Sequence, residues 1–315
     1  MKENFAILTD AGGDFTREII AKYGIEETPM STVVWPDGSE KPTDLYWDTM
    51  KPDEYFALMN NKKNNFCSSI PSPQTMLDRL SALAEQGRNV VVFTISSTMS
   101  GGYSAFTVAA NEVMEKYPNI KIVIIDSLRY SGAITLLAVE ASICRDERGM
   151  SFDDTVNYLQ HFRLRIHECG FLDDLFFLAR KGRIKKGLAF MGNLIGVKPM
   201  ADLCNETGQS MVLGKARGYK QVMRVFPSYI QKTIGDYSDK VFVVTYSARE
   251  PQALQMKQII EETFRPKHLI FVPMGQSTGC NVGPGLAAAF YAGDEKVSEN
   301  CVKEKAILEE LLKKK

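Results

Sequence analysis

The chain has 315 residues with 44% hydrophobic and 24% charged side chains, which is typical of a globular protein of about two domains. Its 38 basic residues balance 38 acidic ones, so we expect no nucleic-acid partner, and without a long apolar run we expect no stable membrane insertion. Six scattered cysteines and only three histidines favour a cytoplasmic protein with reduced thiols and no metal site.

Short apolar strands alternate with amphipathic helices in the first half of the chain. We predict strands over residues 5–9, 89–95 and 120–125, and helices over residues 15–23, 52–59, 73–86, 102–117 and 134–147. Asp14 is expected to be the N-cap of the first helix. The run NVVVFTI, at 89–95, is typical of a strand buried on both faces. This alternation predicts an N-terminal α/β domain over residues 1–150, with a mostly parallel sheet and helices on both faces.

The second half predicts a mixed α/β domain over residues 151–315. Helices are expected around His161 and over residues 175–179, 188–195, 219–233, 252–264 and 297–315. Strands are expected over residues 240–246 and 268–272, with another starting within 170–172. Residues 197–201 and 210–213 are expected to form a hairpin, because a turn containing Asn205 and Gly208 lies between them. Because no Gly- or Ser-rich linker occurs near residue 150, the two domains should pack closely.

Three segments rich in hydroxyl groups or glycine are candidate binding loops. They are residues 67–73 (CSSIPSP), 95–102 (ISSTMSGG) and 279–285 (GCNVGPG), and we expect each to precede a helix. In open α/β sheets, ligands bind at the carboxyl ends of strands, where hydroxyl groups and helix N-termini offer hydrogen-bond donors. A single serine in such a loop is most often a helix cap, but the second segment holds four hydroxyl groups, more than one cap needs. Two such loops together would form a site for a small anion.

The motifs of the main competing enzyme classes are missing from the sequence. It contains no GxSxG with a histidine beside a hydroxyl cluster, as a serine hydrolase would, and no GxxxxGK[ST] phosphate loop. We therefore interpret the chain as a binding protein rather than an enzyme, and expect no cofactor. A site of this kind suits a small carboxylate or a phosphate.

The order of several motifs resembles that of the DegV-type fatty-acid-binding proteins. Residues 95–101 closely match the Ile-Ser-Ser-x-Leu-Ser-Gly signature of this family, and residues 68–72 resemble its Thr-Ser-x-Pro-Ser segment. Weaker matches occur at residues 7–10, 126–127, 181–184, 195–199 and 283–285. The resemblance extends over about residues 5–291, which is the whole chain except the last helix.

This resemblance implies a two-domain fold with one long-chain fatty acid buried between the domains. The family pattern places the fatty-acid carboxylate against the hydroxyl groups of Ser68 and Ser100, next to Gly101. Asn281 stands where several members have a histidine; its amide can donate a hydrogen bond but cannot carry charge.

The resemblance also implies a protein partner, the separate ATP-dependent subunit of a bacterial fatty acid kinase. This subunit would convert the presented fatty acid to an acyl phosphate. Arg183 and Arg217 match family arginines that would support phosphorylation or docking of the kinase subunit, although either could be a solvated surface side chain. The sequence departs from the family pattern at Ala11, Ser68 and Lys181, where the family has Ser, Thr and Gly.

Overall fold

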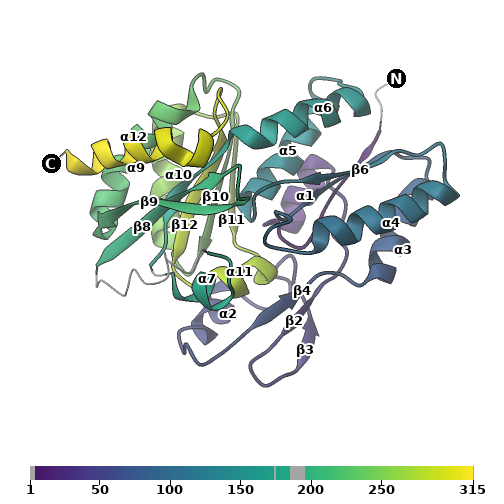
Figure 1. Cartoon of the computed structure of the whole chain (residues 1–315), viewed down its shortest axis with the longest axis horizontal. Coiled ribbons are helices and arrows are strands. Elements are labelled where there is room, and N and C mark those ends of the chain that lie inside the picture. Colours follow the sequence, from purple (N-terminus) through teal and green to yellow (C-terminus); the bar gives the residue numbers. More distant parts are fainter. Residues whose placement is uncertain (1–3, 174, 185–195, 315) are drawn as a thin grey trace.

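The computed structural model describes residues 4–173, 175–184 and 196–314. Its two main sheets lie side by side, with helices around and between them (Figure 1). The first, called here the parallel sheet, has the order β1-β5-β6 and is formed by β1 (Ala6–Thr9), β5 (Val90–Thr94) and β6 (Ile122–Asp126). Every residue of β5 is buried, as the apolar run predicted. Helices α3 (Pro73–Glu85) and α4 (Gly102–Lys116) cover one face and α5 (Gly132–Asp146) contacts the other, which confirms the predicted α/β arrangement.

The second sheet, called here the mixed sheet, has the order β11-β10-β12-β7. It consists of β7 (Ile166–Phe171), β10 (Val241–Ser247), β11 (His268–Pro273) and β12 (Leu286–Ala292). Only β10 and β11 pair in parallel. The α-helices among the described residues of this half are α6 (Phe152–Phe162), α7 (Phe176–Arg180), α9 (Gly218–Ile234), α10 (Glu250–Phe264), α11 (Gln276–Val282) and α12 (Val302–Lys313). The predicted hairpin is present, with the longer strands β8 (Val197–Cys204) and β9 (Gln209–Arg217).

Helix α5 packs between the two sheets. It contacts β1 and β5 on one side and β10 and β12 on the other, and all its residues from Gly132 to Arg145 are buried. Gly132 lies so close to the mixed sheet that a Cβ there would come within 2.6 Å of the Phe290 ring. The division of the chain into two domains near residue 150 stays a prediction.

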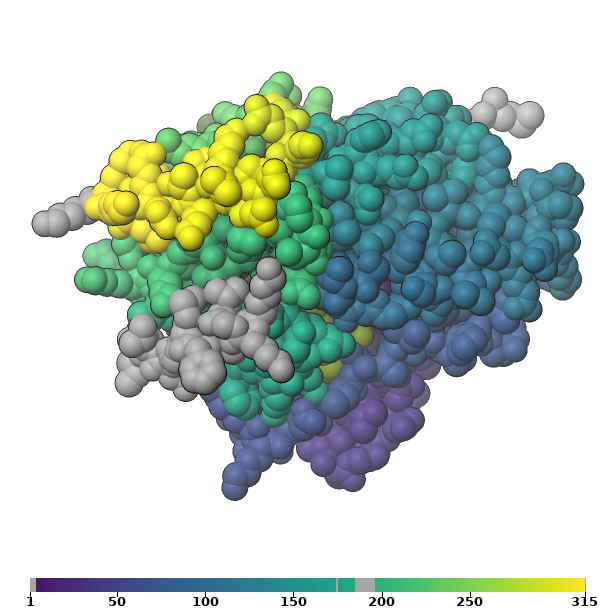
Figure 2. All heavy atoms as spheres, in the orientation of Figure 1, coloured from purple at the N-terminus to yellow at the C-terminus, as the bar shows by residue number. Residues whose placement is uncertain are grey.

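The last helix, α12, lies on the surface of the second half, where Figure 2 shows the C-terminal segment in yellow over the green residues. It packs against α9 and β9 through the buried side chains of Leu308 and Leu311. Among the described residues, no helix has both the length and the hydropathy that crossing a membrane requires.

A small antiparallel sheet in the first half was not predicted. Its order is β3-β2-β4, formed by β2 (Thr32–Val34), β3 (Glu40–Pro42) and β4 (Cys67–Ser69). The first half also contains the short helices α1 (Arg17–Tyr23) and α2 (Pro52–Leu58). Ser68, expected in a loop, therefore lies on strand β4, opposite Val33 of β2.

Three further local predictions were wrong. Helix α1 is capped by Thr16 and not by Asp14, because the buried Asp14 side chain accepts hydrogen bonds from Ser131, Thr245 and the Gly275 backbone instead. Strand β7 begins at Ile166, four residues before the predicted start. The 279–285 segment lies largely in helix α11 and precedes strand β12, not a helix. The helix predicted over residues 188–195 lies outside the described residues.

Candidate ligand-binding cavity

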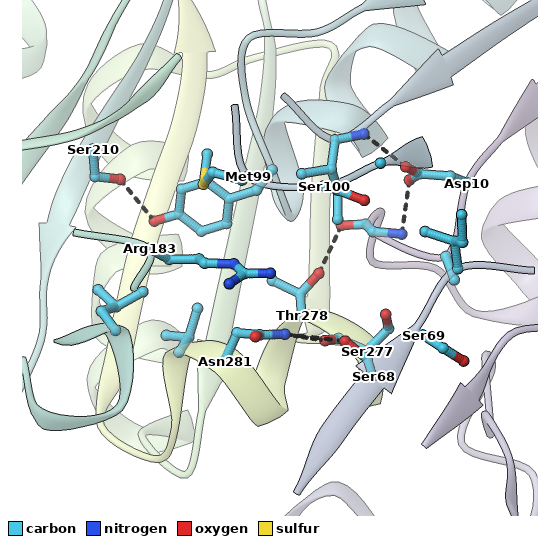
Figure 3. A pocket seen from close by; sticks show the side chains of 18 of the residues that line it. Asp10, Ser68, Ser69, Met99, Ser100, Arg183, Ser210, Ser277, Thr278 and Asn281 are labelled. Carbon is cyan, nitrogen blue, oxygen red and sulfur yellow. Dashed lines mark hydrogen bonds between the residues drawn. The ribbon is translucent and has the colours of Figure 1, made fainter. Parts of the chain in front are cut away.

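A cavity of about 400 Å³ lies at the carboxyl ends of β1 and β5. The segments that follow these strands form part of its wall, and β4, α7, α11 and β9 complete it. The lining therefore combines residues from position 10 to position 282 (Figure 3). This is the location at which open α/β sheets bind ligands. The volume lies within the range of about 300–1,000 Å³ that is usual for small-molecule sites.

Ser68 and Asn281 meet directly at the cavity wall. The Asn281 side-chain amide donates to Ser68 Oγ at 3.1 Å and to the Ser277 carbonyl oxygen at 2.9 Å. Both Ser68 and Asn281 are half-buried. Because Ser68 Oγ accepts from Asn281, its own O–H is available to donate to an oxygen inside the cavity.

Ser100 and Gly101 line the cavity at the N-terminus of α4. Ser100 Oγ accepts a hydrogen bond from the Gly102 backbone at 3.2 Å, and Gly101 is the N-cap residue of the helix. No atom lies within 4 Å of the position that a Cβ would take at Gly101, so the missing side chain leaves open space there. The first amide groups of a helix carry partial positive charge, which favours an anion at this position.

The four residues predicted to bind the ligand, Ser68, Ser100, Gly101 and Asn281, therefore border one cavity. Three are half-buried and Gly101 is exposed. These four predicted residues thus lie near the molecular surface.

The two predicted arginines are not brought together. Arg183 lines the cavity, and Figure 3 shows its guanidinium group reaching between Ser210 on one side and Asn281 on the other. Arg217 lies at the end of β9 in a separate surface groove, where the neighbouring basic side chains are Lys215, Lys220, Arg224, Lys313 and Lys314. The cavity therefore contains one of the two predicted cationic side chains.

Asp10 also lines the cavity, although the sequence pattern did not identify it as a site residue. Its carboxylate accepts hydrogen bonds from the backbone of Gly12 at 2.9 Å and of Ile95 at 2.7 Å. Burial raises the pKa of Asp10 to about 6, an effect that these two bonds partly oppose. Asp10 thus joins the segments that follow β1 and β5, and so fixes one wall of the cavity.

Four other polar lining residues, Ser277, Thr278, Tyr130 and Ser210, were also missed. The first two follow β11 in the segment QSTG, whose run of hydroxyl groups is a signal that could have identified them. Tyr130 and Ser210 come from distant segments and stand in no local pattern.

In the described parts of the chain, no group of His, Cys, Asp and Glu side chains is arranged to hold a metal ion.

Comparison with known proteins shows where this fold occurs. The model of the DegV family, described as an uncharacterised protein family, matches residues 4–294. A Thermotoga maritima protein named fatty acid-binding protein is 25% identical over 288 residues, which cover 89% of this chain and 94% of that protein. A Streptococcus pyogenes DegV domain-containing protein is 28% identical over 210 residues, covering 67% of this chain and 72% of that protein.

Two solved structures have the same fold. A stearic acid-binding protein from Eubacterium ventriosum gives a TM-score of 0.79 at 22% identity, covering 92% of this chain and 98% of that chain. The Fatty Acid Kinase (Fak) B3 protein of Streptococcus pneumoniae, loaded with linoleic acid, gives 0.77 at 21% identity, covering 92% of this chain and 100% of that chain. Because the family match extends over nearly all of the sequence, as the order of motifs predicted, this chain belongs to the DegV family.

Proposed function

We propose that this chain binds one long-chain fatty acid in the cavity and presents its carboxylate to a separate ATP-dependent kinase subunit. The observation that supports this most is the convergence of Ser68, Ser100, Gly101 and Asn281 on one cavity. Apolar side chains, among them Ile95, Met99, Leu178 and Val282, line the rest of it. Relatives whose names state fatty acid binding support the same ligand class.

Hydrocarbon burial would supply most of the affinity. A palmitate-length tail has about fifteen apolar carbons, each worth ~0.8 kcal/mol on burial, so ~12 kcal/mol in total. Association costs of ~4–15 kcal/mol offset much of this gain. The polar groups would therefore set the orientation of the ligand, and they would prevent the large cost of an unpaired buried carboxylate.

The hydrogen-bond donors favour the carboxylate at the surface end of the cavity. Ser68 O–H, Ser100 O–H and the N-terminus of α4 are neutral donors, and the exposed Arg183 adds a positive charge at the rim. A carboxylate held there would face outward, where a second protein can reach it. Similarity to a protein named as a fatty acid kinase component supports a kinase as that second protein. Six free cysteines support a cytoplasmic location for this chain.

Native mass spectrometry of the protein purified from a bacterial host tests the proposal. We expect an added mass of one fatty acid, which organic extraction removes and oleate restores. A protein that arrives without added mass and does not bind oleate or palmitate would overturn the proposal. In that case a small carboxylate or a phosphate becomes the better ligand class, because the same donors suit either anion.

A further inference from the structure

A buried polar cluster forms part of the cavity wall away from Ser68 and Asn281. We call it the Tyr130 cluster; it consists of Tyr130, Glu168 and Ser210. Tyr130 Oη donates to the Glu168 carboxylate, 2.9 Å from Oε1 and 3.0 Å from Oε2. Ser210 Oγ shares its hydrogen between Glu168 Oε2 at 3.2 Å and Tyr130 Oη at 3.3 Å.

The cluster packs against the mixed sheet and faces the cavity with two of its members. Tyr130 is 6% exposed and Glu168 2%. The Tyr130 ring packs edge-on against Phe290 of β12, with 6.2 Å between ring centroids. Tyr130 and Ser210 line the cavity, and in Figure 3 Ser210 lies across Arg183 from Asn281. An acyl chain that starts at Ser68 and Asn281 and fills the cavity therefore reaches these two oxygens.

The hydrogen bonds within the cluster leave capacity for a ligand. With Glu168 ionised, both hydroxyl hydrogens are directed to it, and Tyr130 Oη and Ser210 Oγ keep lone pairs that can accept. Burial raises the pKa of Glu168 to about 8, so its carboxyl is largely protonated at neutral pH. A protonated Glu168 donates one hydrogen bond itself, which frees a hydroxyl group of the cluster to donate into the cavity.

An alcohol is the ligand group that fits both states, because it donates and accepts. A plain methylene chain at this wall leaves the remaining hydrogen-bonding capacity of Tyr130 and Ser210 unused, whereas a polar group on the chain can use it. A ketone only accepts, and a second carboxylate would be repelled by ionised Glu168. We propose that the cavity selects a hydroxylated long-chain fatty acid, whose chain hydroxyl group binds Tyr130 and Ser210. This inference rests on the proposed function and narrows its ligand class.

Calorimetric titration of the delipidated protein with stearate and with a panel of hydroxystearates tests this inference. The members of the panel differ only in which carbon of the acyl chain carries the hydroxyl group. We expect one positional isomer to bind about tenfold more tightly than stearate, as for one good buried hydrogen bond. Ser210→Ala and Tyr130→Phe, tested separately, should each bind that isomer only about as tightly as stearate, while stearate itself still binds. Ser69→Ala, which removes another hydroxyl group of the cavity lining, is the matched control and should keep the preference.

The outcomes separate this inference from the proposed function. Failure of stearate and of every hydroxystearate to bind the wild-type protein overturns both. If stearate binds and no isomer exceeds it, only the hydroxyl subsite is wrong, and the Tyr130 cluster serves to join the loop before α5 to the second half of the chain. A preference that survives both Ser210→Ala and Tyr130→Phe also overturns the inference. The wild-type comparison alone remains decisive if a variant fails to fold.

Discussion

Ser96 and Ser100 belong to the same hydroxyl-rich segment but have different neighbours. Ser100 lines the cavity, whereas Ser96 is fully buried and its Oγ shares a hydrogen bond with Thr98 at 3.1 Å. We expect Ser100→Ala to weaken oleate binding about tenfold, because a hydrogen bond to a carboxylate is worth roughly 1.5–3 kcal/mol. Ser96→Ala should leave oleate affinity within about twofold and act only on stability. Calorimetric titration of both variants checks this; equal, negligible losses would argue against Ser100 as a head-group ligand.

Arg217 and Arg183 allow ligand binding and kinase coupling to be separated. Arg217 lies in the basic groove outside the cavity, so Arg217→Ala should keep wild-type oleate affinity. The rate of acyl phosphate formation with the kinase subunit should fall at least several-fold. Arg183→Ala, on the cavity rim, should reduce oleate affinity itself. The measurements are oleate titration and phosphate transfer from ATP, and loss of oleate binding by the Arg217 variant would show that its role is misassigned.

At the level of elements, the sequence predicted best those that are long or buried on all sides. Strand β5 and helix α5 are apolar over nearly their whole length, so their burial was evident from composition alone. The small sheet was missed because β2, β3 and β4 have three residues each, too few to show an alternating pattern. Ser68 was therefore identified from its motif, while the strand that positions it was not.

The glycine of α11 misled the prediction for a different reason. Gly279 suggested a loop, but it lies inside the helix, where a Cβ would be 2.8 Å from the ring of Phe56. The residue is glycine because α11 packs closely against α2, not because the backbone needs an unusual conformation. Close packing of this kind depends on tertiary contacts that a local pattern does not contain.

Gly279→Ala should consequently destabilise the protein although alanine is the better helix former. The helix preference is worth ~1 kcal/mol in favour of alanine, whereas overpacking in a dense core costs ~1–3 kcal/mol. Phe56 is fully buried and has little room to move, so we expect a net loss. Urea unfolding measures the difference in the free energy of unfolding between this variant and the wild-type protein. Gly101→Ala is the control, since no atom lies within 4 Å of its Cβ position; equal stability of the two variants would contradict the packing argument.

At the scale of the whole molecule, buried acids join the two sheets beside the cavity. Asp14 follows β1 and accepts from Thr245 of β10 at 2.8 Å and from the Gly275 backbone at 2.9 Å. Glu168 of β7 accepts from Tyr130 in the loop before α5. These partners are 231, 261 and 38 residues apart in the sequence. Local patterns identify Ser68 and Ser100, but contacts over such separations appear only in the folded structure.

These buried acids should make the protein less stable as the pH rises. Burial raises the pKa of Asp14 to about 6 and that of Glu168 to about 8, from the ordinary values of 3.8 and 4.5. The folded state therefore binds more protons than the unfolded state between these limits. Its stability is greatest below the unfolded pKa and falls as the pH rises towards the folded pKa. The contributions of Asp14 and of Asp10, whose pKa burial also raises to about 6, are nearly complete only near pH 7, so between about pH 7 and 8 the slope should come mainly from Glu168.

Glu168→Gln isolates this contribution because glutamine keeps the shape and hydrogen-bonding capacity of the protonated carboxyl. In the wild-type protein, the free energy of unfolding should fall between about pH 7 and 8 by at most ~1.4 kcal/mol per pH unit, the limit for one proton. The variant should show a nearly flat profile over the same interval. Urea unfolding at several pH values measures both slopes. Parallel profiles for the two proteins would mean that Glu168 does not lose a proton from the folded state between pH 7 and 8, and the argument from its raised pKa would be wrong.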